Sequence, residues 1–138
     1  MSTRADRGQA LVEFALIIPI LLILLIAIFD VGRLVFAYND ITNSARSGVR
    51  VAIVNQGGTV ARDATINQAS LGLQPSDVTI TYLNSAADAA CGNPYKVGCL
   101  ARVTVRFPWS SITPIIGSIL GPITVTTSTT MPIEPVFP

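Results

Sequence analysis

The chain lacks the residues that most catalytic sites require. It contains no histidine, which is the commonest metal ligand and the commonest general acid–base in enzymes, and its one lysine is Lys96. Its eight acidic residues are scattered, with no pair placed for hydrolytic work. Glycine-rich nucleotide loops and the G-x-S-x-G motif are absent. We therefore expect a protein that is not an enzyme, with no cofactor, no metal and no small-molecule substrate.

Charge is also scarce. Only 12% of the 138 residues are charged, against about a quarter in an average soluble protein. The net charge of +1 gives no electrostatic reason to expect a nucleic-acid partner. Half of the residues are hydrophobic, and this length suits one small domain plus an appendage.

The longest apolar run lies near the N-terminus. Residues 9–29 form a helix of about 31 Å, which matches a hydrocarbon core about 30 Å thick. Arg4 and Arg7 precede the run and Asp30 follows it, so the positive-inside rule predicts a cytoplasmic N-terminus and an exported C-terminal part. A cleaved signal peptide and a plain uncleaved anchor are alternatives to a processed membrane helix. The run is long for a signal peptide and contains a glutamate.

That glutamate, Glu13, is the anomaly of the run. An acidic residue well inside a membrane helix costs roughly 2.5–3.5 kcal/mol, so it calls for a partner. Glu13 lies five residues after Gly8, and cleavage after Gly8 would free an amine on Gln9. Such an amine can pair with the carboxylate within one helix or between neighbouring helices, where it would also set their register. The alternative is that Glu13 lies close enough to the membrane surface to stay hydrated.

Helical periodicity continues beyond the membrane, so we expect residues 30–55 to be an amphipathic extension of the same helix. Asp30 and Asp40 are predicted to be surface charges on this extension. Its apolar positions recur every three or four residues: Val31, Leu34, Val35, Tyr38, Ile41, Ala45, Val49 and Ile53.

Residues 56–138 are predicted to form an exported α+β domain. A short second helix is expected at 59–71, and the period then changes to two, as in half-buried strands. Three alternating runs at 78–82, 101–107 and 123–131 predict a small antiparallel sheet of about three strands. A sheet of this size is marginal alone, so the two helices are expected to cover one of its faces.

Both cysteines fall in one predicted loop, 84–100. An even number of cysteines in an exported domain favours a Cys91–Cys99 disulfide. Free thiols are the main alternative. A metal or redox role is disfavoured because histidine is absent and the spacing is not C-x-x-C.

The connector 108–121 is unusually apolar. Its side chains Trp109, Ile112, Ile115 and Ile116 form a candidate interaction surface. It could equally cover the sheet edge, touch the membrane surface, or pack on the domain's own core.

Two blocks of sequence resemble the TadE-like family, the minor pilins or pseudopilins of tight-adherence (Tad, type IVc) pilus systems. The first comprises Gly8-Gln9-Ala10-Leu11-Val12-Glu13-Phe14-Ala15-Leu16, Pro19 and Phe29-Asp30-Val31-Gly32-Arg33. The second is Ala45-Arg46-Ser47-Gly48-Val49-Arg50-Val51-Ala52. Beyond Ala52 the resemblance to the family is limited to a general β-rich character.

The resemblance implies that residues 1–8 are a leader that a prepilin peptidase removes between Gly8 and Gln9. Glu13 then becomes the fifth mature residue, followed by Phe14, and meets the N-terminal amine of an adjacent subunit during assembly. Major pilins of these systems are essentially one helix. A chain with an added β domain is therefore expected to be a minor subunit that serves in adhesion and surface attachment.

The implied partners are the membrane, the prepilin peptidase, other pilin or pseudopilin subunits and the Tad assembly machinery. The implied location is the cytoplasmic (inner) membrane as a single-pass protein, and then the pilus or cell surface. The alternative function is a membrane-anchored, exported binding module that never enters a pilus.

Overall fold

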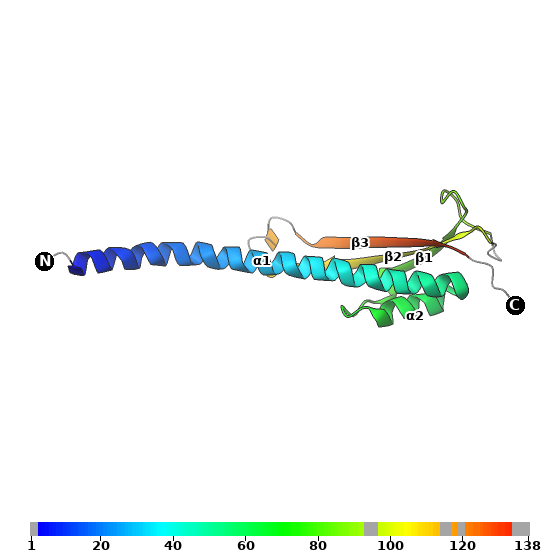
Figure 1. The fold of residues 1–138 in the computed structure, drawn as a ribbon, viewed down its shortest axis with the longest axis horizontal. Helices are drawn as coiled ribbons and strands as arrows, with labels where there is room; N and C mark the ends of the chain where they lie inside the picture. The colour runs from blue at the N-terminus through cyan, green and yellow to red at the C-terminus, as the bar shows by residue number, and fades with distance from the viewer. Residues whose placement is uncertain (1–2, 93–96, 114–116, 119–120, 134–138) are drawn as a thin grey trace. The chain divides into compact units, whose positions relative to one another are not determined.

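The computed structural model describes residues 3–92, 97–113, 117–118 and 121–133, with side chains described from Gly8 onward. Within these ranges the fold is α+β, as the sequence predicts (Figure 1). Its elements are the helices α1 (Thr3–Val54) and α2 (Gly58–Gln68), the short 3-10 helix η1 (Pro75–Asp77), and the strands β1 (Val78–Leu83), β2 (Leu100–Trp109) and β3 (Ile123–Pro132).

The chain divides into two compact units. Unit 1 contains Met1–Leu34 and Ser110–Pro122, and unit 2 contains Val35–Trp109 and Ile123–Pro138. Helix α1 therefore contributes its first part to unit 1 and the remainder to unit 2. The segment between β2 and β3 belongs to unit 1, together with the apolar part of the helix.

Unit 2 is built on a three-stranded antiparallel sheet with the order β1-β2-β3. In the central strand Ala101, Val103 and Val105 are completely buried, whereas Arg102 and Arg106 lie on the opposite face. The predicted period of two is therefore confirmed, and it separates a core face from a solvent face.

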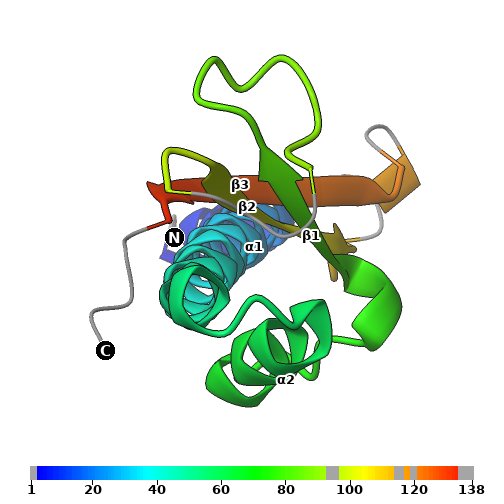
Figure 2. The same ribbon diagram turned by 90° about the vertical axis from the view of Figure 1, so that its right-hand side faces the viewer.

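Both helical segments of unit 2 cover the same face of the sheet (Figure 2). The part of α1 in this unit buries a stripe that begins at Ala37 and consists mostly of small side chains: Ala37, Ile41, Ser44, Ala45, Gly48, Val49 and Ala52. The apolar face predicted for 30–55 is correct at Ile41, Ala45 and Val49. It is wrong at Val31, Val35 and Tyr38, which remain 60%, 53% and 50% exposed.

Gly48 marks the closest approach of α1 and α2. A Cβ added at this position would overlap Thr65 Oγ1 and would lie 3.2 Å from the carbonyl oxygen of Ala61. The Thr65 hydroxyl cannot easily turn away, because it donates a 2.8 Å hydrogen bond to that same carbonyl. Only glycine therefore allows this helix–helix distance.

Helix α2 ends three residues before the predicted boundary at position 71. Ala69 is extended, with φ −79° and ψ 135°. The Asp40 carboxylate of α1 then accepts hydrogen bonds from Ser70 N and Ser70 Oγ, both at 2.9 Å. Asp40 is therefore a half-buried anchor for the end of α2 and not the free surface charge that was predicted.

The predicted disulfide is present between Cys91 and Cys99. Cys91 N donates to Tyr82 O of β1 at 2.9 Å, and Cys99 O accepts from Ile133 N at 2.8 Å. The bridge thus ties the loop between β1 and β2 to both outer strands. For a ring of this size, loop-closure entropy corresponds to a stabilisation of about 2–3 kcal/mol.

Replacing Gly48 by alanine should destabilise unit 2 by about 1–3 kcal/mol, because the new methyl group overpacks the α1–α2 contact. Thr65→Ala removes the oxygen that the methyl group meets, so the double variant should lose less stability than the sum of the single variants. Urea unfolding of the full chain in detergent micelles measures both effects. Gly32→Ala is the matched control, because an added Cβ there meets nothing within 4 Å. Additive losses in the double variant would contradict this account.

Candidate assembly site

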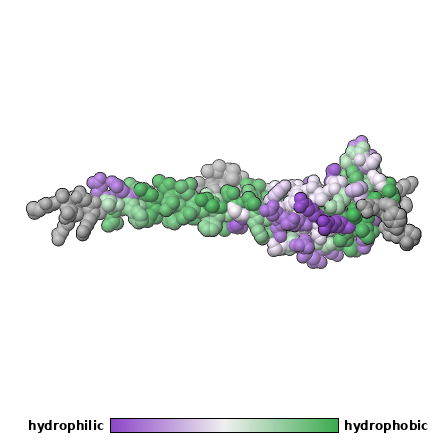
Figure 3. Space-filling view, viewed as in Figure 1, coloured by the Kyte–Doolittle hydropathy of each residue, from purple (hydrophilic) through white to green (hydrophobic). Residues whose placement is uncertain are grey.

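The first part of α1 carries its apolar side chains on the outside. From Gly8 to Phe29 every side chain is exposed or half-exposed, and the apolar stretch has a mean hydropathy of 3.1 with no residue buried in the fold. On the face that Figure 3 shows, most of this stretch is apolar, and hydrophilic atoms lie at its N-terminal end. By length and composition α1 can cross a membrane, and among the described residues it is the one helix that can. Such a surface is stable only in lipid or against other apolar helices.

Glu13 lies near the N-terminal end of this surface, and its hydrogen-bond partner among the described side chains is Gln9. Gln9 Nε2 donates a 3.2 Å hydrogen bond to Glu13 Oε1, one helical turn along α1, and both side chains are exposed. The adjacent Phe14 is 63% exposed. An amide satisfies one lone pair of the carboxylate but does not neutralise its charge. Within the described side chains, the charge of Glu13 therefore has no cationic partner.

Gly8 lies on the same exposed helical surface, five residues before Glu13. A Cβ added at Gly8 would meet nothing within 4 Å, so the fold itself does not require glycine there. Any requirement for glycine at this position must come from something that acts on the chain.

Asp30 accepts more hydrogen bonds than Glu13, the other carboxylate of unit 1 whose side chain is described, and the expectation that it is a surface charge was wrong. It is 2% exposed and accepts bonds from Ile112 N and Thr113 N, both at 2.9 Å, and from Thr113 Oγ1 at 2.6 Å. Arg33 Nη1 lies 3.4 Å from Asp30 Oδ1. Residues 110–113 return to α1 at this point, so the carboxylate that ends the apolar run also holds the chain segment that follows β2.

These bonds lower the pKa of Asp30 from 3.8 to about 2. The Thr113 hydroxyl has the largest effect, followed by the backbone N–H of Ile112. The Thr113 N–H and the Arg33 guanidinium act in the same direction, whereas burial opposes them.

Of the four residues in the candidate interaction surface of 108–121, the structure describes Trp109 and Ile112, and only Ile112 is exposed. Trp109, the last residue of β2, is only 6% exposed, so its ring belongs to the interior. Ile112 is 66% exposed while its backbone binds Asp30. Ile115 and Ile116 lie outside the described residues.

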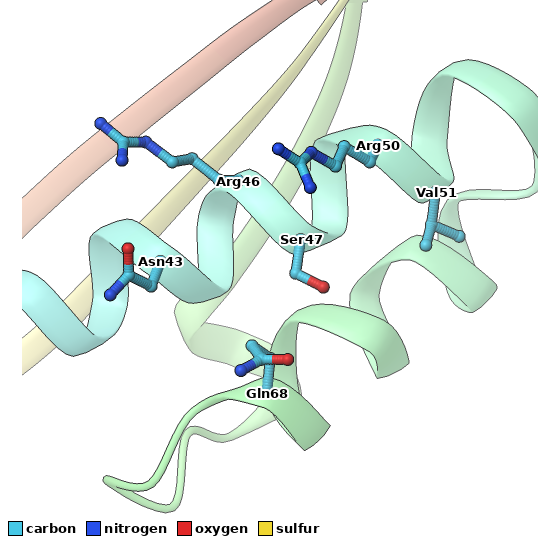
Figure 4. Close-up of a pocket in the computed structure, with 6 residues that line it drawn as sticks. All are labelled: Asn43, Arg46, Ser47, Arg50, Val51 and Gln68. Atoms are coloured by element: carbon cyan, nitrogen blue, oxygen red, sulfur yellow. The ribbon is translucent and has the colours of Figure 1, made fainter.

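A groove of about 450 Å³ lies between α1 and α2 in unit 2. Figure 4 shows Ser47 pointing towards Gln68 of α2, and the side chains of Arg46 and Arg50 one turn apart on α1. The remaining lining residues are Asn43 and Val51. Two exposed guanidinium groups with amide and hydroxyl neighbours are suited to binding an anionic group. The residues that line the groove include no acid–base pair for catalysis. The part of the chain that the structure describes also holds no group of three or more side chains placed to bind a metal ion.

A comparison with protein-family models identifies the N-terminal segment. Residues 8–50 match the family described as TadE-like protein. This segment is TadE-like. The resemblance proposed from the sequence is therefore confirmed over these residues. No curated protein and no solved structure matches the chain.

The structure gives physical reasons for three parts of the TadE-like segment. Residues 8–14 form the N-terminal part of the exposed apolar stretch of α1, and Glu13 is the one carboxylate among them. Asp30 binds the segment that follows β2. Gly48 permits the close packing of α2 on α1. The role of Gly48 could not be predicted from the sequence, because glycine spacing along one helix does not reveal which glycine faces another element.

The low pKa of Asp30 gives a pH prediction. Because the folded-state pKa lies below the ordinary value, the stabilising contribution of Asp30 should be complete above about pH 4 and lost as the pH falls through about 2. Thr113→Val removes the strongest cause and should raise this pKa towards 3.8, whereas Thr113→Ser should preserve it. Titration of the Asp30 ¹³Cγ shift by NMR, in the full chain in micelles, measures the pKa of all three forms. Equal pKa values for the valine and serine variants would contradict the assigned cause.

Proposed function

We propose that this protein is a structural minor pilin or pseudopilin of a Tad-type pilus, processed by a prepilin peptidase after Gly8. The match of residues 8–50 to the TadE-like family, on a helix with a fully exposed apolar surface, carries the proposal. The mature chain inserts this helix into a bundle of neighbouring pilin helices at the base or tip of the filament. Unit 2 is displayed outside the membrane and contributes to adhesion and surface attachment.

Glu13 acts as the assembly contact. Before cleavage its hydrogen-bond partner among the described side chains is the neutral amide of Gln9. Cleavage between Gly8 and Gln9 creates an ammonium group at the start of the mature helix. Two unpaired charges in lipid are costly, and pairing the Glu13 of one subunit with the new amine of another removes both costs while fixing their axial register.

In the membrane, the proposed precursor spans once, with Arg4 and Arg7 in the cytoplasm. Unit 2 then lies outside the cytoplasmic (inner) membrane, in a compartment compatible with the Cys91–Cys99 disulfide. The partners are the peptidase, other pilin subunits and the assembly machinery.

Processing can be tested by the intact mass of membrane-expressed protein, with and without the peptidase. The expected mature chain begins at Gln9. Gly8→Arg should abolish cleavage, and Gly32→Arg should not, although both positions are equally open in the fold. A mature chain that starts elsewhere, or efficient cleavage of Gly8→Arg, would overturn the processing step. Unprocessed, monomeric protein outside the pilus fraction would favour the alternative of an anchored binding module.

Assembly can be tested separately with Glu13→Gln. This variant keeps the hydrogen-bonding shape but removes the charge, so cleavage should persist while incorporation into sheared pili falls about tenfold, equivalent to ~1.4 kcal/mol. Glu13→Asp is the control: it keeps the charge and should retain more incorporation than the glutamine variant. Incorporation of Glu13→Gln at the wild-type level would show that charge pairing is not the role of Glu13.

A further inference from the structure

The sheet of unit 2 has two outer strands, β1 and β3, which differ in length and in how much of their outer edge is occupied. β1 has only six residues, and the Cys91–Cys99 loop covers its end. Tyr82 O accepts from Cys91 N at 2.9 Å, and a further bridge joins Leu83 to Ala90. The outer edge of β1 is therefore short and partly occupied by its own chain.

β3 has ten residues, and the direction of its backbone groups follows from one hydrogen bond. Ile133 N donates to Cys99 O at 2.8 Å, directly beyond the Leu100–Pro132 pair. In an antiparallel ladder such bonded pairs alternate with non-bonded pairs. The odd-numbered residues of β3 therefore bond to β2, and the even-numbered residues direct their N–H and C=O groups away from the sheet. These are Thr124, Thr126, Ser128 and Thr130, all with exposed side chains.

This row of outward backbone groups is bare in the part of the chain that the structure describes. No backbone hydrogen bond outside the sheet ladder involves these residues. Native proteins normally protect a long edge with lysine, a bulge or an internal proline. β3 carries no charged residue, and its one proline, Pro132, is the last residue of the strand. An unprotected edge of this length is suited to accepting another strand.

The charge of the solvent face indicates which kind of strand would fit. Arg102 and Arg106 of β2 lie on the same face as the even-numbered residues of β3, as their pairing with Thr130 and Thr126 shows. Arg102 Nε donates a 3.1 Å hydrogen bond to Thr130 Oγ1, so its guanidinium lies over the outer strand. Neither arginine forms a salt bridge within the described residues. None of the three strands contains an acidic residue.

We propose that β3 is a docking edge that accepts, as a fourth strand, an extended segment of a partner protein with acidic side chains on the Arg102/Arg106 face. The backbone of Thr124 to Thr130 supplies the ladder hydrogen bonds, and the two arginines select for carboxylates. A second copy of this chain fits less well, because none of its strands offers a carboxylate and its β1 edge is partly occupied. The site is independent of cleavage after Gly8 and of Glu13.

Amide hydrogen exchange of the full chain in micelles tests whether the edge is open. The odd-numbered amides of β3 should exchange slowly, and those of Thr124, Thr126, Ser128 and Thr130 should exchange fast. Protection of the even-numbered amides in the free protein would overturn the proposal, because the edge would already be covered. Protection that rises with protein concentration would identify a second copy as the occupant and would also overturn it.

Binding is tested with a fluorescent peptide of sequence Thr-Glu-Val-Glu-Val-Glu-Thr, with a peptide that has lysine in place of glutamate as comparison. The acidic peptide should bind more tightly and should protect the four even-numbered amides. Ser128→Pro deletes one outward N–H and should weaken binding on the order of tenfold, whereas Ser128→Ala keeps that N–H and should not. Protection of the odd-numbered amides reports whether each variant keeps its fold.

The charge preference is tested without touching the backbone of β3. The double variant Arg102→Glu and Arg106→Glu should reverse the preference, so that the lysine peptide binds more tightly than the acidic one. No binding of either peptide, no preference between them, or equal binding by the Ser128→Pro and Ser128→Ala variants would overturn the proposal.

Discussion

The close packing of the C-terminal part of α1 is the constraint on which unit 2 depends. The apolar face of a small three-stranded sheet must be buried against another layer, and here helices provide that layer. That layer is provided by a stripe of small side chains, in which Ala45, Gly48 and Ala52 are completely buried. Small side chains keep the helix close to its neighbours, and at Gly48 the distance to α2 leaves no room for a methyl group. The stripe therefore lets the C-terminal part of α1 pack closely in the core of unit 2.

Three carboxylates of α1, those of Glu13, Asp30 and Asp40, have different hydrogen-bond partners. Asp30 receives three hydrogen bonds from Ile112 and Thr113 and a fourth from Arg33, all within unit 1. Asp40 holds the end of α2 in unit 2. Among the described side chains, Glu13 has the amide of Gln9 as its hydrogen-bond partner, on the exposed apolar surface of α1. The contrast lies in the partners: Asp30 and Asp40 bind backbone groups of distant segments, whereas Glu13 binds the side chain of Gln9 on its own helix.

The sequence predicted the strands well because each of them has a strong local signal. All three strands were located within two residues of their ends, since apolar and polar residues alternate along β1 and β2 and β3 is rich in β-branched residues. Helix α2 was predicted too long, because its end depends on a hydrogen bond from Ser70 to Asp40, thirty residues earlier in the chain. Burial along α1 was predicted only in part, since a helix of this composition has several apolar faces and the periodicity does not say which of them the sheet covers.

The sequence by itself determined the apolar helix with its single glutamate, the alternation of the strands, and the resemblance to TadE-like proteins in residues 8–50. All of these are patterns of residues close together in the sequence, so they can be recognised without knowing how distant segments pack. Only the tertiary structure decided that Asp30 is buried, that Gly48 is a packing contact, that Trp109 is internal, and that β3 has an open edge beside two arginines. Each of these depends on groups that the chain brings together from distant positions, and hydrogen bonding and close packing of that kind leave no periodic trace in the sequence.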